Sequence, residues 1–215
     1  TDYIGQEDDD SYDRLSFAVT GQSKVSDALS LDVASRFEEG SYDYDSAWGG
    51  APGNEFENFH VKLGADYVVG DLFAQVSLAT SKNESFNLSN GEQTSEFTTK
   101  RDQASVLVQY QLNANTSLTG GSNWYVEKVS GSSDYAINER DVTAFYVQAR
   151  HQIDQLFFEG AVRRDDIEGV TGQTTYNASL GYQINDNLLI SLSRATAFKA
   201  PSFNDLYYPE SWGYV

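Results

Sequence analysis

Two acidic clusters are the residues of this chain best suited to chemistry. One is Glu7-Asp8-Asp9-Asp10, and the other is Tyr42-Asp43-Tyr44-Asp45. Clustered oxygen ligands suit Ca²⁺, which takes about six to eight of them in irregular geometry. Neither cluster is an EF-hand, because the glycine at the sixth loop position and the glutamate at the twelfth are missing. Charge runs are usually solvated, so the residues alone allow either a calcium site or ordinary loop carboxylates.

Aromatic and amide side chains near the second cluster could bind a ligand. The candidates are Tyr42, Trp48, Phe86 and Asn87. Large flat ligands are usually held by apolar and aromatic surface with a few polar groups. Each of the four could equally pack within a loop or lie at a membrane interface.

Catalysis is not expected. His60 and His151 are the only histidines, and neither is placed to meet an acidic residue as a protease at an acidic rim would require. Nucleophile-elbow, zinc-protease and phosphate-loop motifs are absent from the sequence. The net charge of −18 argues strongly against a nucleic-acid partner, whose phosphates require a basic surface.

The elements that would position these residues are β-strands. Apolar and polar residues alternate from Phe59 to Tyr67, so they sort onto opposite faces of a strand. The same pattern predicts about ten strands, each of about 10 residues, as a tilted membrane strand needs. Without an apolar run near ~20 residues, a helical span is excluded. The apolar faces run through Leu15–Val19, Leu29–Val33, Phe59–Tyr67, Leu72–Leu78, Ala104–Leu112, Leu118–Val126, Phe145–Ala149, Leu156–Val162, Tyr176–Tyr182 and Leu188–Leu192.

The connections between these strands alternate in length. Short turns at one end of the sheet and long loops at the other are the pattern of an outer-membrane β-barrel. Aromatic residues such as Tyr67, Trp124 and Tyr182 would form its interfacial girdle. The strands of a soluble antiparallel sandwich or a lipocalin-like barrel also alternate between apolar and polar residues, so these folds remain alternatives. Tight turns are predicted near 22–27, 69–71, 113–115, 153–155 and 184–187, and long polar loops at 37–55, 81–98, 129–140 and 164–173.

Two segments carry a family resemblance. The run Ser191–Tyr207, with Phe198-Lys199-Ala200-Pro201 followed by Leu206-Tyr207, resembles the strand-to-loop signature of TonB-dependent receptors. Phe158–Asp166 is similar to the preceding strand in the cobalamin-importing members of that family. The resemblance implies an all-β fold, an antiparallel transmembrane barrel of about 22 strands closed around a plug domain. Residues 1–215 are then expected to be a partial barrel domain of about ten strands, without the plug, from a processed or excised chain.

The resemblance also implies a function and a site. It implies import of cobalamin or another scarce nutrient through the outer membrane of a Gram-negative bacterium, energised by TonB through the plug, with outer-membrane lipid and lipopolysaccharide around the wall. Asp8, Asp10, Tyr42 and Asp43 match the positions at which cobalamin transporters hold calcium, which orders the loops that bind substrate. The alternatives are a siderophore or haem receptor of the same family, or a small self-contained outer-membrane porin or protease. Arg163-Arg164-Asp165-Asp166 is expected to be an ion-pair ladder in the wall, and Lys199 and Pro201 to shape the exit into the loop.

Overall fold

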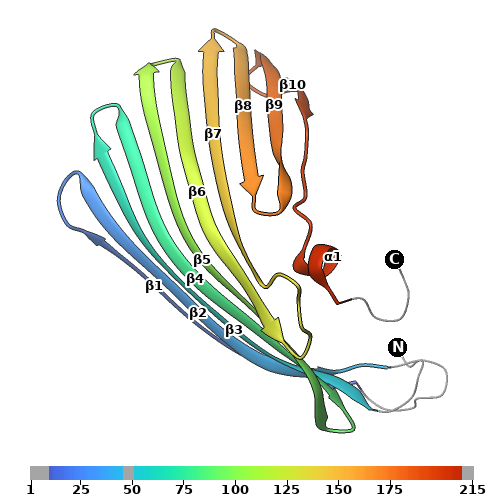
Figure 1. The fold of residues 1–215 in the computed structure, drawn as a ribbon. Coiled ribbons are helices and arrows are strands. Elements are labelled where there is room, and N and C mark those ends of the chain that lie inside the picture. The colour runs from blue at the N-terminus through green and yellow to red at the C-terminus, as the bar shows by residue number, and fades with distance from the viewer. Residues whose placement is uncertain (1–9, 46–50, 210–215) are drawn as a thin grey trace.

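The computed structural model describes residues 10–45 and 51–209. They form one antiparallel sheet of ten strands in which every strand pairs with its neighbours in sequence, in the order β1 to β10 (Figure 1). The strands are β1 (Tyr12–Lys24), β2 (Leu29–Asp43), β3 (Pro52–Val69), β4 (Leu72–Ser89), β5 (Glu92–Asn113), β6 (Thr116–Gly131), β7 (Glu139–Ile153), β8 (Leu156–Ile167), β9 (Val170–Asn185) and β10 (Leu188–Ala195), followed by one short helix, α1 (Phe203–Tyr207). No helix among the described residues is long and apolar enough to cross a membrane.

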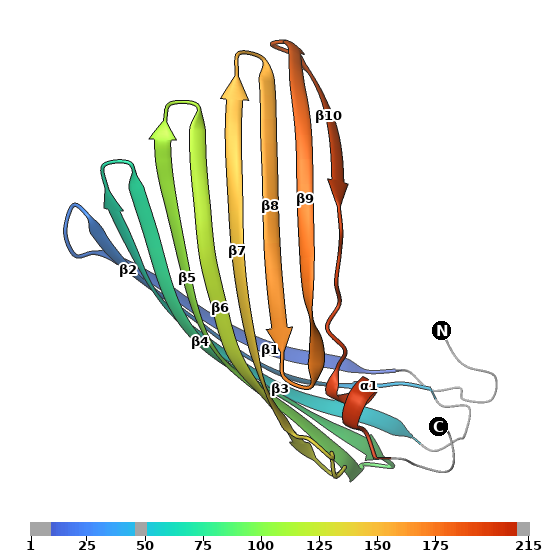
Figure 2. The same ribbon diagram turned by 45° about the horizontal axis from the view of Figure 1, so that its top comes forward.

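The sheet is curved and open. β1 and β10 are its two edges and do not pair with each other, and the turned view shows the gap between them (Figure 2). A self-contained ten-stranded porin or protease would join these two edges, because a barrel removes its edges by closing. The described residues therefore form a section of a barrel wall.

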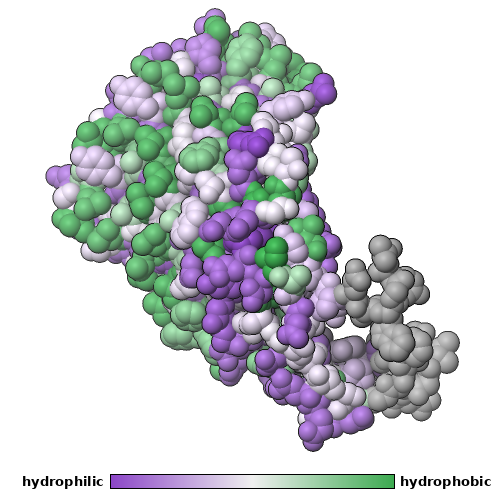
Figure 3. Space-filling view, in the orientation of Figure 1, coloured by the Kyte–Doolittle hydropathy of each residue, from purple (hydrophilic) through white to green (hydrophobic). Residues whose placement is uncertain are grey.

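The apolar face of the sheet is exposed along its length, which excludes the soluble alternatives. Leu63, Val76 and Val108 are 53%, 47% and 40% exposed, whereas a sandwich would bury them against a second sheet. We call the face that carries these residues the outer face. The expected girdle residues Tyr67, Trp124 and Tyr182 also lie exposed on it. In Figure 3 hydrophobic residues gather over the upper part of the molecule, toward the tight turns, and hydrophilic residues predominate toward the lower end.

All five predicted tight turns are confirmed, between β1 and β2, β3 and β4, β5 and β6, β7 and β8, and β9 and β10. They lie together at one end of the sheet (Figures 1 and 2). We call the opposite end, where α1 lies, the mouth end. Of the candidate residues, those that the structure describes, Asp10, Tyr42, Asp43, Phe86 and Asn87, belong to the mouth end.

Most of the predicted long loops are instead strand. β4 continues to Ser89 and β5 starts at Glu92, so that 81–98 is a hairpin closed by Asn90 and Gly91, both with positive φ (51° and 79°), as a two-residue hairpin turn requires. β2 runs on to Asp43, and β8 and β9 meet at a two-residue turn within 164–173. The predicted strand length of about 10 residues is therefore too short, since β5 has 22.

The reason for this error is physical. Beyond the bilayer both faces of a strand meet water, so the side chains no longer alternate between apolar and polar, while the backbone ladder continues unchanged. Only 132–138 of the predicted 129–140 loop is a connection, between β6 and β7.

The predicted ion-pair ladder is confirmed: Arg163 binds Asp165 at 2.7 Å, and Arg164 binds Asp166 at 2.9 Å.

Candidate functional site

An inner-face row of side chains crosses the mouth end of the sheet. Tyr42 on β2 pairs with Asn54 on β3, Asn54 pairs with Asn87 on β4, and Asn87 pairs with Ser95 on β5. Since side chains directly opposite one another share a face, these four lie side by side. They lie on the face opposite to Leu63, Val76 and Val108, which we call the inner face. The predicted residues Tyr42 and Asn87 are thus brought into one row, with Asn54 between them.

Hydrogen bonds hold the amides of this row. The Asn54 Nδ2 donates to Ser85 Oγ at 2.8 Å and to Asn87 Oδ1 at 3.2 Å, while Asn87 Nδ2 donates to Ser95 Oγ at 2.9 Å. Asn54 is only 5% exposed, and a buried amide needs hydrogen-bond partners within the protein. The row is therefore a fixed polar surface on rigid strands.

Aromatic rings continue the row at its β2 end. The ring of Tyr42 lies 6.1 Å from that of Tyr44 and 6.5 Å from that of Phe56, centroid to centroid. Gly40 makes room for Phe56, because a Cβ at position 40 would lie 2.7 Å from the Phe56 ring and 2.4 Å from the Asp13 carbonyl oxygen. Aromatic surface beside amides is the combination that suits a large flat ligand.

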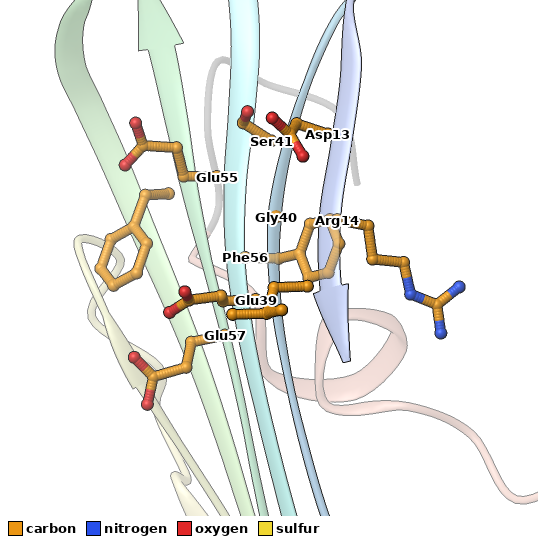
Figure 4. A pocket seen from close by; sticks show the side chains of 10 residues that line it. Asp13, Arg14, Glu39, Gly40, Ser41, Glu55, Phe56 and Glu57 are labelled. Carbon is orange, nitrogen blue, oxygen red and sulfur yellow. The ribbon is translucent and has the colours of Figure 1, made fainter. Parts of the chain in front are cut away.

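Phe86 lies on the other face. It shares the outer face with Val76 because the β4–β5 pairing runs without a shift up to Asn87. A hollow of about 430 Å³ adjoins it, lined by the carboxylates of Asp13, Glu39, Glu55 and Glu57 among others. Figure 4 shows these glutamates on one side of the sheet and Arg14 and Phe56 on the other. Phe86 therefore does not adjoin Tyr42 and Asn87. Trp48 lies outside the described residues.

The four predicted calcium ligands are only partly brought together. Asp8 lies outside the described residues. Asp10 directly precedes Ser11, whose carbonyl accepts from the Asp43 N–H at 3.0 Å and whose hydroxyl donates to Asp43 at 2.5 Å. Tyr42 and Asp43 are successive strand residues, so their side chains point to opposite faces.

The donor atoms at this corner suit calcium in kind. Carboxylates and backbone carbonyls are its usual ligands, and Asp10 and Asp43 supply carboxylates from two neighbouring chain segments. Within the described ranges, however, no group of three or more histidine, cysteine or acidic residues is placed to hold a metal ion. The described residues alone therefore do not form a metal site, and the calcium site stays a prediction.

A second inner-face cluster lies where the chain after β10 returns to the wall. We call residues 196–208 the strap. Arg140 on β7, 6% exposed, anchors it: Nη1 donates to the Pro201 carbonyl at 2.7 Å, and the guanidinium lies 4.7 Å from the Phe203 ring centroid. Nε and Nη2 both donate to Glu127 Oε2, at 2.9 and 2.8 Å. Phe203 itself is 7% exposed.

Further contacts hold the far end of the strap. The Tyr135 hydroxyl donates to Asn204 Oδ1 at 2.5 Å, and its ring meets Tyr208 edge-on at 5.8 Å. The Ala136 N–H donates to the Tyr207 carbonyl at 3.3 Å. Burial raises the pKa of the Tyr135 hydroxyl, which keeps it a donor. The strap is thus tied to the wall at both ends of α1.

A capping box starts α1. Ser202 Oγ accepts from the Asp205 N–H, and the Asp205 carboxylate accepts from the Ser202 N–H at 2.8 Å. The Asp205 carboxylate also accepts from the Ser202 hydroxyl at 2.8 Å, and its two bonds from Ser202, the backbone one first, lower the pKa of Asp205. Beside α1 a hollow of about 460 Å³ is lined by polar inner-face residues that include Asn83, Thr99 and Arg101. The mouth end therefore offers two polar inner-face surfaces, the amide row and this hollow.

Asn54, Arg140 and α1 were not predicted from the sequence. The signal for α1 was present as Ser202 followed by Asp205, the spacing of a capping box. Asn54 could have been found only from the strand register. Arg140 contacts a residue 61 positions away, and nothing local in the sequence marks such a contact.

Comparison with known proteins identifies the family. The model of the TonB dependent receptor-like β-barrel matches residues 1–213. The vitamin B12 transporter BtuB of Photobacterium profundum is 33% identical over 209 residues, which cover 96% of this chain and 34% of that protein. BtuB of Vibrio vulnificus strain YJ016 is 26% identical over 196 residues, 87% of this chain and 32% of its own. The chain thus spans about a third of the length of these relatives.

Solved structures agree on the fold. The siderophore receptor PirA of Pseudomonas aeruginosa aligns with a TM-score of 0.66 at 15% identity, over 90% of this chain and 41% of its own. The outer-membrane transporter YddB of Escherichia coli aligns with a TM-score of 0.65 at 10% identity, over 80% and 30%. The family consists of receptors and transporters rather than enzymes. The chain belongs to the β-barrel family of TonB-dependent receptors, outer-membrane proteins of Gram-negative bacteria.

Proposed function

We propose that the chain forms part of the wall of a transporter that binds cobalamin and imports it across the outer membrane. The observation that carries this proposal is the 33% identity to a vitamin B12 transporter, which extends over 96% of the chain. TonB would act through the plug domain that the family resemblance implies. Outer-membrane lipid and lipopolysaccharide would surround the exposed apolar face.

The amide row is the proposed substrate surface. Tyr42 and Phe56 offer ring faces to a flat ligand, and the amides of Asn54 and Asn87 offer donors and acceptors at its edge. Because the row lies on paired strands, binding costs little ordering of these side chains. Phe86 is left out of the proposed set, since it lies on the outer face. Trp48 stays a candidate outside the described residues.

Calcium is the second part of the proposal. Asp10 and Asp43 would contribute carboxylates at the corner between β1 and β2, Tyr42 a backbone carbonyl, and Asp8 a further carboxylate. A cation there would offset the repulsion between carboxylates and hold the two segments together. The corner lies beside the amide row, because Tyr42 belongs to both.

Equilibrium binding of cobalamin to the full-length protein in detergent, with calcium or with a chelator, tests both parts. We expect calcium to tighten binding in the native protein, and Asp43→Asn to lose that effect while keeping the calcium-free affinity. Asp186→Asn, at the tight-turn end, is the matched control. Absence of cobalamin binding, with binding of a ferric siderophore or haem instead, would overturn the substrate. Calcium-independent cobalamin binding would overturn only the metal site.

A second pair of variants tests the row itself. Tyr42→Ala should weaken cobalamin binding about tenfold, since an aromatic contact contributes about 1.5 kcal/mol and 1.4 kcal/mol is a factor of ten. Tyr182→Ala removes an equal ring from the outer face and should leave affinity unchanged. Equal effects of the two variants would contradict the placement of the substrate on the inner face.

A further inference from the structure

Three lysines stand side by side on the outer face near the mouth end. Lys82 on β4 is paired with Lys100 on β5, and Lys100 is paired with Lys128 on β6. Neighbouring strands lie about 4.8 Å apart, so three positive side chains share about 10 Å of wall. Like charges directly opposite one another destabilise a sheet. Such a row therefore needs an anion beside it.

The existing partners of these lysines only partly meet that need. Lys82 is bound by Glu84, and Lys128 by Glu139 at 2.9 Å. Both lysines remain exposed, at 39% and 52% of their side chains, and ion pairs of that exposure contribute little. Lys100 is exposed and makes no ion pair with any described residue. Asp102, one outward position below it, accepts from the Thr80 hydroxyl at 2.7 Å.

The place of the row in the wall indicates what kind of anion fits. Lys100 lies on the same face as Val106 and Val108, and Lys128 on the same face as Trp124. Trp124 is exposed, as expected for an aromatic at the membrane interface. Lys128 lies four residues beyond it, about 13 Å along the strand, which carries it from the edge of the hydrocarbon into the headgroup layer.

An apolar contact adjoins the charges. Phe59 on β3 is paired with Lys82 and is 40% exposed on the outer face. A free inorganic anion would gain nothing from this ring, whereas a lipid would place acyl carbon against it. The outer face is thus cationic along the row and apolar at Phe59, at the β3 end of the row, and at Leu78 and Trp124, which lie nearer the tight turns. Its chemistry matches an amphipathic ligand with a phosphorylated head.

We propose that Lys82, Lys100 and Lys128 form a binding site for the phosphorylated headgroup of an outer-leaflet lipid. The central Lys100 contacts the phosphate without displacing a partner. Lys82 and Lys128 exchange exposed ion pairs for charge-assisted bonds to phosphate oxygens. The site is independent of the proposed cobalamin site, because it lies on the opposite face of the sheet.

Native mass spectrometry of the full-length protein in detergent tests this site without any transport substrate. The probes are diphosphoryl lipid A, the same lipid with its phosphates removed, and inorganic phosphate as competitor. We expect the native protein to retain the diphosphoryl lipid, to bind the dephosphorylated lipid at least tenfold more weakly, and to resist competition by millimolar phosphate. Equal retention of both lipids, or displacement by phosphate alone, would overturn the proposal.

Variants assign the binding to the row. Each lysine near an anionic headgroup layer should contribute about fivefold in affinity, so Lys100→Gln should weaken binding about fivefold and the triple change of Lys82, Lys100 and Lys128 to Gln about a hundredfold. The triple change to Arg keeps the charges and should retain binding, which separates loss of charge from misfolding. Lys24→Gln, at the tight-turn end and also exposed, should bind as the native protein does. A loss of affinity in Lys24→Gln equal to that in Lys100→Gln would refute the assignment.

Discussion

Replacing Arg140 by methionine should release the strap from the wall without unfolding the sheet. Methionine is long and apolar, so it fills much of the space of the buried side chain and leaves the backbone pairing of β7 intact. What it removes are the two contacts that reach the strap, the hydrogen bond to the Pro201 carbonyl and the stacking on Phe203. The bonds to Glu127 orient Arg140 but do not touch the strap.

The magnitude follows from those two contacts. A hydrogen bond from a charged donor contributes about 1.5–3 kcal/mol, and a partly desolvated cation–π contact about 0.5–2 kcal/mol. A loss near 3 kcal/mol from the docking free energy would raise the undocked population about a hundredfold. Arg140→Lys keeps the charge but not the geometry of the guanidinium, and should lie between the native protein and Arg140→Met.

The Ala136 N–H is the reporter, because it donates to the Tyr207 carbonyl only while the strap is docked. Hydrogen exchange at Ala136 should accelerate about a hundredfold in Arg140→Met, while amides within β7 keep their rates. Arg150→Met is the matched control: it lies on the same strand and face, but its pair with Glu159 is exposed and far from the strap. Unchanged exchange in Arg140→Met, or equal acceleration in both variants, would refute the anchoring role.

Three further outcomes follow from the same structure. Val106→Arg places a charge on the outer face and should cost about 2–4 kcal/mol of unfolding free energy in lipid vesicles; a smaller loss than for a lysine-row variant would contradict the bilayer position. Asn54→Ala leaves its buried partners without a hydrogen bond and should lower the free energy of unfolding by about 1–2 kcal/mol, measured from the midpoint of denaturant unfolding. An unchanged midpoint would show that the hydrogen bonds of the amide row do not stabilise the sheet. The lowered pKa of Asp205 means that the capping box is at full strength above the ordinary value of 3.8 and weakens as pH falls below it. The protection factor of the strap amides, the intrinsic over the observed exchange rate, should therefore fall on acidification in the native protein, whereas Asp205→Asn should show no such step.

The membrane-spanning part of the fold was predictable because its two faces meet different surroundings. Leu63, Val76 and Val108 alternate with polar residues, and the structure exposes all three on the outer face. The tight turns were predictable for the same reason, since the alternation ends at them. Because one face meets lipid and the other meets water, apolar and polar residues alternate along each membrane-spanning strand.

The mouth end was harder to predict because that contrast is lost there. From Ser81 to Ser89 both faces of β4 carry polar residues, and hydropathy alone cannot tell such a strand from a loop. The interactions that hold it are ladder hydrogen bonds and cross-strand pairs such as Asn87 with Ser95. These depend on a partner strand, which the local sequence does not reveal.

Counting every second residue along a strand assigns its side chains to a face even where hydropathy no longer distinguishes the two faces. Counting by twos from Val76 along β4 reaches Phe86 on the outer face and leaves Asn87 on the inner face, because the β4–β5 register is unbroken up to Asn87. In a loop at 81–98, Phe86 and Asn87 could lie together, but as successive strand residues they lie on opposite faces. The same count from Val106 places Lys100 outside, so that one strand extension assigns a substrate candidate to one face and a lipid contact to the other. Once strands extend past the bilayer, the face of a residue decides whether it meets the lumen or the headgroups, and neighbours in sequence necessarily serve different partners.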